Sequence, residues 1–181
     1  MCMTRMNIFE PGEPISVSPL KTFPIIKDLV TDVSYNYEKA KSVPAFKPRP
    51  KDADGKHRMF QEDIDRVQEF HKCIECFLCQ DVCHVIRDHD DKKRAFSGPR
   101  FFIKLAGLDM HPLDTRDRAR FIKDEAGVGL CNITKCCTEV CPEHIHITDN
   151  GIIPLKERAA DSLDPILWLM RKFRGQKSPQ A

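Results

Sequence analysis

Two short runs of cysteine constrain this chain more than any other feature of its sequence. Nine of the 181 residues are cysteine, and eight of these fall within positions 73–83 and 131–141. Thiols three residues apart turn toward a common point, which suits a metal centre better than separate disulfides. No apolar leader occurs over Met1–Glu10, so we expect a reducing compartment, where clustered thiols are more often metal ligands or catalytic groups. The sequence therefore predicts a metal centre.

The first run has the spacing C-x2-C-x2-C-x3-C. Its members are Cys73, Cys76, Cys79 and Cys83. This spacing is typical of proteins that bind two iron–sulfur clusters, in which the fourth cysteine of a run ligates the other cluster. The second run ends in the matching C-x3-C-P, from Cys137 through Cys141 to Pro142. The ligands predicted for a 4Fe-4S cluster are Cys73, Cys76, Cys79 and Cys141.

The second run lacks one cysteine of this pattern. Repeating the first spacing from Cys131 requires a cysteine at position 134, where the chain has Thr134. Three thiolates suffice for a 3Fe-4S cluster, whose absent iron would face a side chain that is not a soft ligand. Cys136 is left over; it replaces Cys137 only if the helix turns, and Cys137 alone keeps the x3 spacing to Cys141. The ligands predicted for this cluster are Cys83, Cys131 and Cys137.

Other centres fit the spacing less well. A zinc ribbon uses two C-x2-C pairs, whereas the first run has three cysteines at consecutive x2 intervals and a fourth three residues on. A c-type haem needs C-x-x-C-H, and the stretch from Cys79 to His84 has one residue too many. A disulfide framework conflicts with the odd number of cysteines and with the expected compartment. Iron–sulfur ligation is the favoured interpretation.

Composition excludes some partners and the simplest membrane topology. Lys and Arg number 29 against 27 Asp and Glu, and a net charge of +2 is too small to select nucleic acid. Hydrophobic residues make up 41% of the chain, enough to bury a core. No apolar run approaches the roughly 18–20 residues that span a bilayer.

Two domains are expected, of which the second is all α. Short extended pieces over 7–9 and 15–17, separated by a Pro- and Gly-containing turn, indicate the end of a β structure. Apolar residues at helical spacing predict a helix over 25–42, and the prolines of 43–50 cannot continue it. We place the boundary there, giving domains 1–48 and 49–181.

Helical patterns continue through the second domain. One face of a helix over 60–71 leads into Cys73, and Ser97-Gly98-Pro99 predicts a helix start with Ser97 as the cap. Asp114 is the candidate cap of another helix, which Gly127 is placed to end. A last helix from Asp164 carries an apolar stripe beside basic residues, a pattern that favours packing over lying on a membrane. The two cysteine runs resemble each other and form an imperfect internal repeat.

With these motifs in place, the chain resembles the iron–sulfur subunit of succinate dehydrogenase and fumarate reductase over nearly its whole length. The resemblance implies the same division of cluster ligands, and residues 27–34 look like the family's linker helix. It also implies a mainly α fold, with an α-helical ferredoxin domain after the remnant of a plant-type 2Fe-2S ferredoxin domain. Cys2 would be the final ligand of that 2Fe-2S centre, so the chain is expected to begin inside the domain.

The resemblance further implies an electron-transfer subunit of an oxidoreductase. Electrons would pass from a flavoprotein subunit with FAD, through the clusters, to quinone at a membrane anchor on the cytoplasmic face of the inner membrane. Quinone-reactive relatives follow the residue matching Cys83 with Pro and the residue matching Cys131 with His; here these positions are His84 and Asn132, which we take as the candidate quinone-proximal residues. The alternatives are a soluble two-cluster carrier and an iron–sulfur subunit of another dehydrogenase.

Overall fold

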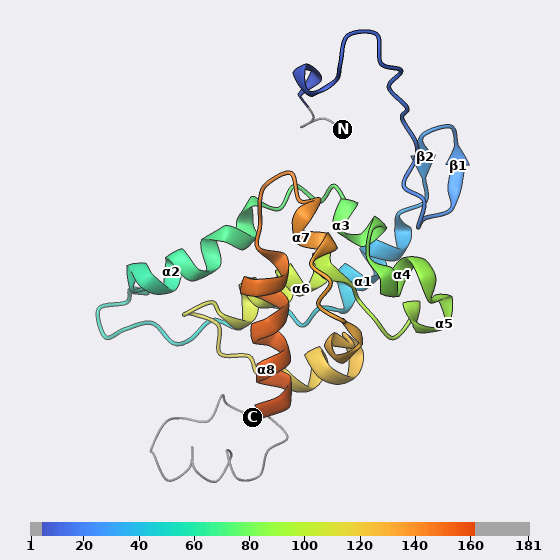
Figure 1. Ribbon diagram of the computed structural model, residues 1–181. Helices are drawn as coiled ribbons and strands as arrows, with labels where there is room; N and C mark the ends of the chain where they lie inside the picture. The colour runs from blue at the N-terminus through green and yellow to red at the C-terminus, as the bar shows by residue number, and fades with distance from the viewer. Residues whose placement is uncertain (1–4, 162–181) are drawn as a thin grey trace.

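The computed structural model describes residues 5–161 as short helices gathered round one longer helix, with a small hairpin standing off to one side (Figure 1). The α-helices are α1 (Ser34–Ser42), α2 (Gln61–Gln68), α3 (Leu78–Asp81), α4 (His84–Asp88), α5 (Asp90–Lys93), α6 (Pro99–Asp109), α7 (Cys136–Glu139) and α8 (Ile153–Asp161). The 3-10 helices are η1 (Met6–Ile8), η2 (Glu69–Lys72) and η4 (Val128–Leu130), and the π-helices are η3 (Phe121–Glu125) and η5 (Ile147–Ile152). The strands are β1 (Ile25–Lys27) and β2 (Val30–Thr31). The mainly helical fold predicted from the sequence is confirmed.

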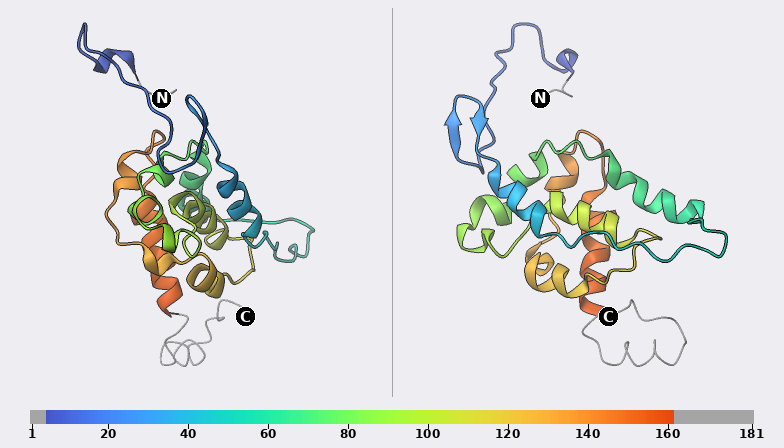
Figure 2. Two further views of the ribbon diagram at one scale, coloured as in Figure 1. Left: turned by 90° about the vertical axis from the view of Figure 1, so that its right-hand side faces the viewer. Right: turned by 180° about the vertical axis from the view of Figure 1, so that it is seen from behind.

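The core of the molecule is built on α6. Its Phe102, Leu105 and Ala106 are completely buried, and the helix packs against α2, α3, α8, η2 and η5. Figure 2 shows α6 enclosed by the other helices when the molecule is turned. Both cysteine runs border this core, because Cys79, Cys83 and Cys137 belong to the same cluster of buried apolar residues.

The helix predicted over 25–42 is correct only in its second half. Residues 25–31 form the antiparallel hairpin β1–β2, with Ile25 opposite Thr31, and α1 begins at Ser34. β-Branched residues crowd this stretch and favour strands, and Asp28 takes a left-handed conformation (φ 50°) that reverses the chain. Apolar residues do recur at helical spacing in this stretch, but Ile25 and Ile26 are exposed and so form no buried helix face. The short extended piece predicted over 7–9 is also wrong, since Met6–Ile8 is a 3-10 turn, and residues 15–17 form no strand.

The proline-rich segment 43–50 ends α1 as predicted and lies against the second half of the chain. Pro48 bridges to Asp114, and the Arg49 N–H donates to the Leu113 carbonyl at 2.8 Å. Asp114 is not the helix cap that the sequence suggested: its carboxylate is 2.7 Å from the guanidinium of Arg118, and both side chains are buried. Asp117 instead accepts the Ala119 N–H at 2.9 Å, where the helical turns begin. A domain boundary at residue 48 stays a prediction.

Two glycines set the ends of helices. Gly98, not Ser97, precedes α6, with φ +91° and Pro99 in the first turn; Ser97 is buried and donates its N–H to the Ala126 carbonyl at 3.0 Å. Gly127 ends the turn of η3 as predicted, with φ +67°. A Cβ there would stand 1.9 Å from the backbone oxygen of Ala95, so only glycine fits.

Two sequence predictions fall outside the described residues. They are Cys2, the expected 2Fe-2S ligand, and the last helix from Asp164 with its apolar stripe and basic neighbours. Within residues 5–161, no helix is long and apolar enough to cross a membrane.

Candidate metal centre

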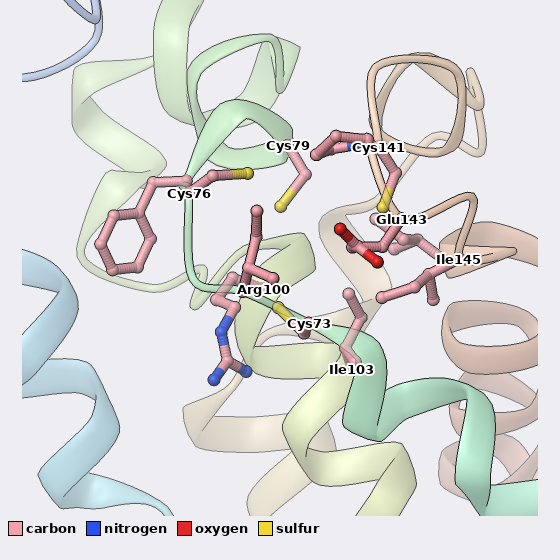
Figure 3. Close-up of a pocket in the computed structure, with 12 residues that line it drawn as sticks. Cys73, Cys76, Cys79, Arg100, Ile103, Cys141, Glu143 and Ile145 are labelled. Carbon is pink, nitrogen blue, oxygen red and sulfur yellow. The ribbon is translucent and has the colours of Figure 1, made fainter. Parts of the chain in front are cut away.

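Four cysteines from both runs line one cavity beside α6. Figure 3 shows the side chains of Cys73, Cys76, Cys79 and Cys141 around a common space. Its other lining residues are Ile74, Phe77, Arg100, Ile103, Pro142, Glu143, Ile145 and Ile147. The four residues predicted to share a 4Fe-4S cluster therefore meet at one mainly apolar cavity.

The other four cysteines of the two runs form a second group. Cys83 and Cys137 are buried, while Cys131 and Cys136 are half-buried. α3, which carries Cys79, packs against α7, which carries Cys137, and Cys136 Sγ lies 3.5 Å from the carbonyl of Val82, the residue before Cys83. The two groups of cysteines thus adjoin where α3 meets α7.

The two cysteine runs fold into the same shape. α3 and α7 pack against each other, and each follows a residue in the left-handed region: Phe77 with φ 59° and ψ 9°, and Lys135 with φ 62° and ψ 0°. Two residues before each of these, Glu75 and Ile133 have φ 57° and 59°. Left-handed conformations are costly for side chains such as isoleucine, and loops of this kind aim backbone N–H groups at anions, including iron–sulfur centres.

Matching the two loops residue by residue assigns a structural counterpart to every ligand position. Cys131 corresponds to Cys73, Cys137 to Cys79, and the loop hydrogen bonds repeat, with N–H to carbonyl distances of 2.9 Å from Gln80 to Phe77 and from Thr138 to Lys135. The counterpart of Cys76 is Thr134, and the counterpart of the spare Cys136 is Leu78. Thr134, the position that lacks a cysteine in the sequence pattern, is therefore also the structural equivalent of a predicted ligand position in the first loop.

Burial favours the protonated thiol at four of the cysteines. It raises the pKa of Cys83 to about 11 and, as the largest cause, raises those of Cys73, Cys79 and Cys137. Hydrogen bonding by Thr148 opposes this at Cys137, and the charge of Arg100 opposes it at Cys73. A metal that binds here must supply the positive charge that displaces these protons.

Buried polar side chains beside the cysteines were missed by sequence reasoning. Gln80 is completely buried, and its amide donates to Asn36 of α1 at 3.2 Å and to the Ser97 carbonyl at 3.1 Å, which fixes α3 against α1. Arg100 lines the cavity, its side chain is 11% exposed, and its Nε is buried without a partner. The local sequence gives no sign of what Gln80 and Arg100 contact, because their neighbours in the fold are distant along the chain.

The two candidate quinone-proximal residues directly follow Cys83 and Cys131 of the second group of cysteines. No hydrogen bond or ion pair within the described part of the chain joins one of them to the other. His84 begins α4; its Nδ1 lies 3.0 Å from the guanidinium of Arg87 and 3.4 Å from Asp88. Asn132 is exposed in the loop after Cys131. Their proximity to a quinone stays a prediction.

Cys136 has neighbours that explain its presence without a role as a cluster ligand. Its Sγ lies 3.5 Å from the Val82 carbonyl and 3.4 Å from Thr134 Oγ1. We expect Cys136→Ser to retain the iron and sulfide content of the wild type, because serine still offers a donor to the carbonyl, and Cys137→Ser to lose part of both. Iron and sulfide analysis of the purified complex checks this pair. Equal losses in the two variants would contradict the assignment of Cys137.

Glu69 fastens the helix before the first cysteine run to the segment after the second. Its carboxylate accepts the backbone N–H of His146 at 2.8 Å, lies 2.7 Å from His146 Nδ1, and accepts from the amide of Asn150. Burial by itself raises the pKa of Glu69, but these hydrogen bonds outweigh it and leave the pKa below its ordinary value of 4.5.

A lowered carboxyl pKa gives stability that is present above the ordinary pKa and is lost as pH falls through the lowered one. We expect Glu69→Gln to destabilise the protein by about 1–2 kcal/mol at pH 7, with a smaller difference from wild type near pH 4. Denaturation midpoints of the two proteins across this range check the prediction. A difference that does not shrink with acid would contradict the role of the ionised carboxylate.

Several known proteins resemble this chain. A model of the 4Fe-4S dicluster domain family matches residues 69–145. The fumarate reductase iron-sulfur subunit of Mycobacterium tuberculosis (strain CDC 1551 / Oshkosh) is 30% identical over 149 residues, covering 80% of this chain and 58% of that protein. The succinate dehydrogenase iron-sulfur subunit of Bacillus subtilis (strain 168) is 28% identical over 172 residues, covering 90% and 62%.

A solved structure matches more strongly. A chain of the Mycobacterium smegmatis Sdh1 complex in the apo form is 63% identical, with a TM-score of 0.86, and the match covers 92% of this chain and 70% of that chain. The chain spans 58% and 62% of the two curated relatives above.

Proposed function

The chain belongs to the family of succinate dehydrogenase and fumarate reductase iron–sulfur subunits, and from this membership we propose that it conducts electrons between a flavoprotein subunit and quinone. The observation that carries the proposal is the arrangement of seven cysteines in two adjoining groups, one of which surrounds a cavity. The partners, succinate or fumarate as substrate, quinone, and a place on the cytoplasmic face of the membrane are parts of the same proposal.

The residues present fit iron–sulfur clusters better than a single metal ion. Within residues 5–161, no three His, Cys, Asp or Glu side chains are grouped closely enough to hold one metal ion, whereas four sulfurs surround a cavity. Arg100, which pairs with Glu75 and has a buried Nε without a partner, lines that cavity with a positive charge suited to an anionic cluster. When bound, the clusters supply one-electron transfer.

We assign the ligands by the loop geometry. A 4Fe-4S cluster would be held by Cys73, Cys76, Cys79 and Cys141, and a 3Fe-4S cluster by Cys83, Cys131 and Cys137. Each run thus gives its last cysteine to the other run's cluster, which ties α3 and α7 into one unit. Ile103 and Ile145, both buried, exclude water from the wall of the first cavity.

Other side chains hold the second group in place. Lys156 of α8 donates to the Cys131 carbonyl at 2.6 Å, which anchors the start of the second loop to the core. The hydroxyl of Tyr35 in α1 lies 2.9 Å from the Lys93 carbonyl and 2.8 Å from the Phe96 carbonyl, and its one proton is shared between them, which fastens α1 beside α5 and the segment before α6. The proposed electron path is therefore supported by α1, α6 and α8.

The test is to purify the complex that contains this subunit anaerobically and record electron paramagnetic resonance spectra before and after adding succinate. An oxidised 3Fe-4S centre is paramagnetic and an oxidised 4Fe-4S centre is silent. We expect a signal in the oxidised complex that succinate removes. Clusters that respond to dithionite but not to succinate would refute the substrate and favour another dehydrogenase; a chain that purifies alone with both clusters would favour a soluble carrier.

A further inference from the structure

Two threonines place a buried hydroxyl against the sulfur of Cys137. Thr148, in η5, is completely buried, and its Oγ1 lies 3.4 Å from Cys137 Sγ. Thr138, the residue after Cys137, has its Oγ1 3.1 Å from Thr148 Oγ1. The Thr138 hydroxyl also accepts the backbone N–H of Thr148 at 3.1 Å. η5 and α7 are thus joined by a short chain of hydrogen bonds that ends at a cysteine sulfur.

The hydrogen bonds of this chain run from Thr138 toward Thr148. Thr138 Oγ1 accepts the N–H of Thr148 and donates its own proton to Thr148 Oγ1. The single proton of Thr148 is then free to point at Cys137. A ligating cysteine is a thiolate without a proton, so in the loaded protein the hydroxyl of Thr148 is the donor.

The first cysteine run has no counterpart of this arrangement at the matching residue. The position equivalent to Thr138 is Gln80, whose amide donates to Asn36 Oδ1 and to the Ser97 carbonyl rather than to a sulfur. The hydroxyl chain is therefore specific to the second group of cysteines, although the two loops share one backbone shape.

We propose that Thr148 is a positioning residue that donates an O–H···S hydrogen bond to the Cys137 thiolate and so raises the reduction potential of the 3Fe-4S centre, with Thr138 orienting its hydroxyl. This inference rests on the cluster assignment proposed above. Hydrogen bonds to ligating sulfurs are among the factors that determine the potentials of iron–sulfur centres. Reduction by one electron increases the negative charge shared by the sulfurs, so a donor to Cys137 stabilises the reduced state more than the oxidised state.

The experiment is a redox titration of the purified complex, followed through the resonance signal of the oxidised 3Fe-4S centre. We expect Thr148→Val to lower the one-electron reduction equilibrium constant roughly threefold to tenfold; a tenfold change corresponds to about 59 mV. Thr148→Ser keeps the hydroxyl and should remain near the wild-type potential. Thr138→Val removes the donor to Thr148 Oγ1 and the acceptor of the Thr148 N–H but leaves the Thr148 hydroxyl in place, and it should give a smaller fall in the same direction.

The potential of the 4Fe-4S centre is the internal control, because Thr148 contacts no ligand assigned to it and a general loss of structure would move both centres. A wild-type potential of the 3Fe-4S centre in Thr148→Val, with full iron content, overturns the inference. If Thr148→Val does not retain the 3Fe-4S centre, the potential of this centre in Thr138→Val is compared with the wild-type potential instead. An unchanged potential in Thr138→Val then overturns the inference. A wild-type complex without an oxidised 3Fe-4S signal refutes the cluster assignment itself, and the inference with it.

Discussion

Replacing Thr134 with cysteine is expected to convert the proposed second cluster site from three thiolate ligands to four. Thr134 is the structural counterpart of Cys76, because the loops around them share left-handed residues at Glu75 and Ile133 and at Phe77 and Lys135. A thiol at this position therefore starts from the backbone of an existing cluster corner. Thr134 is also exposed, so the larger sulfur meets no packed core.

The expected result is loss of the resonance signal of the oxidised complex by about an order of magnitude, with one more iron per chain and a new signal after reduction with dithionite. Four soft ligands complete a 4Fe-4S centre, which is silent when oxidised. Spectra and iron analysis of wild type and Thr134→Cys measure both effects.

Two controls identify the new ligand. Thr134→Ser should leave the oxidised signal intact, since a hydroxyl remains at the corner. Cys136 Sγ lies only 3.4 Å from Thr134 Oγ1, so Thr134→Cys combined with Cys136→Ser must give the same conversion as Thr134→Cys alone. An undiminished oxidised signal with wild-type iron content in Thr134→Cys would contradict the correspondence of the two loops.

The correspondence also explains which parts of the centre were readable from the sequence. Cysteine spacing is a local property that survives in any fold, so it grouped the four cysteines that line the cavity and marked position 134 as a break in the pattern. The same holds for Gly127, whose φ of +67° is required by the turn in which it lies. In both cases, the constraint and the residue that meets it are close together along the chain.

Features that depend on distant partners were not readable. Gln80 bonds to Asn36, Thr148 to Cys137 and Arg118 to the Pro44 carbonyl, and no local pattern marks these pairs. The first part of the helix predicted over 25–42 failed for a related reason, since apolar spacing alone does not report whether a stretch is buried, and Ile25 is exposed. Asp114 was predicted to be a helix cap because aspartate often caps helices. In the folded chain, its carboxylate pairs with Arg118 instead.

Removing the carboxylate of Asp114 is expected to lower the free energy of unfolding more than breaking any other ion pair within residues 5–161. Asp114 Oδ2 lies 2.7 Å from Arg118, with side-chain exposures of 1% and 0%. The guanidinium also donates to the carbonyls of Pro44 at 3.2 Å and Ala45 at 3.0 Å. The pair thereby fastens the proline-rich segment 43–50 to the loop before η3.

We expect Asp114→Ala to destabilise the protein by about 3–5 kcal/mol, because it removes the carboxylate to which a buried guanidinium is bonded. For a protein of this size, that corresponds to a fall of roughly 10 °C in the temperature at which the purified complex loses its iron–sulfur absorbance. Asp114→Asn retains an acceptor of the same shape and should fall between Asp114→Ala and wild type.

The matched control is an exposed pair of the same chemistry. Arg58 and Asp54 form an ion pair with side-chain exposures of 64% and 38%, and solvent screens such a pair to about 0.2–1 kcal/mol. Asp54→Ala should therefore leave the transition temperature within a few degrees of wild type. Equal shifts in Asp54→Ala and Asp114→Ala would mean that burial does not determine the contribution of the Asp114–Arg118 pair, and that segment 43–50 is held by its backbone hydrogen bonds to residues 113–115 instead.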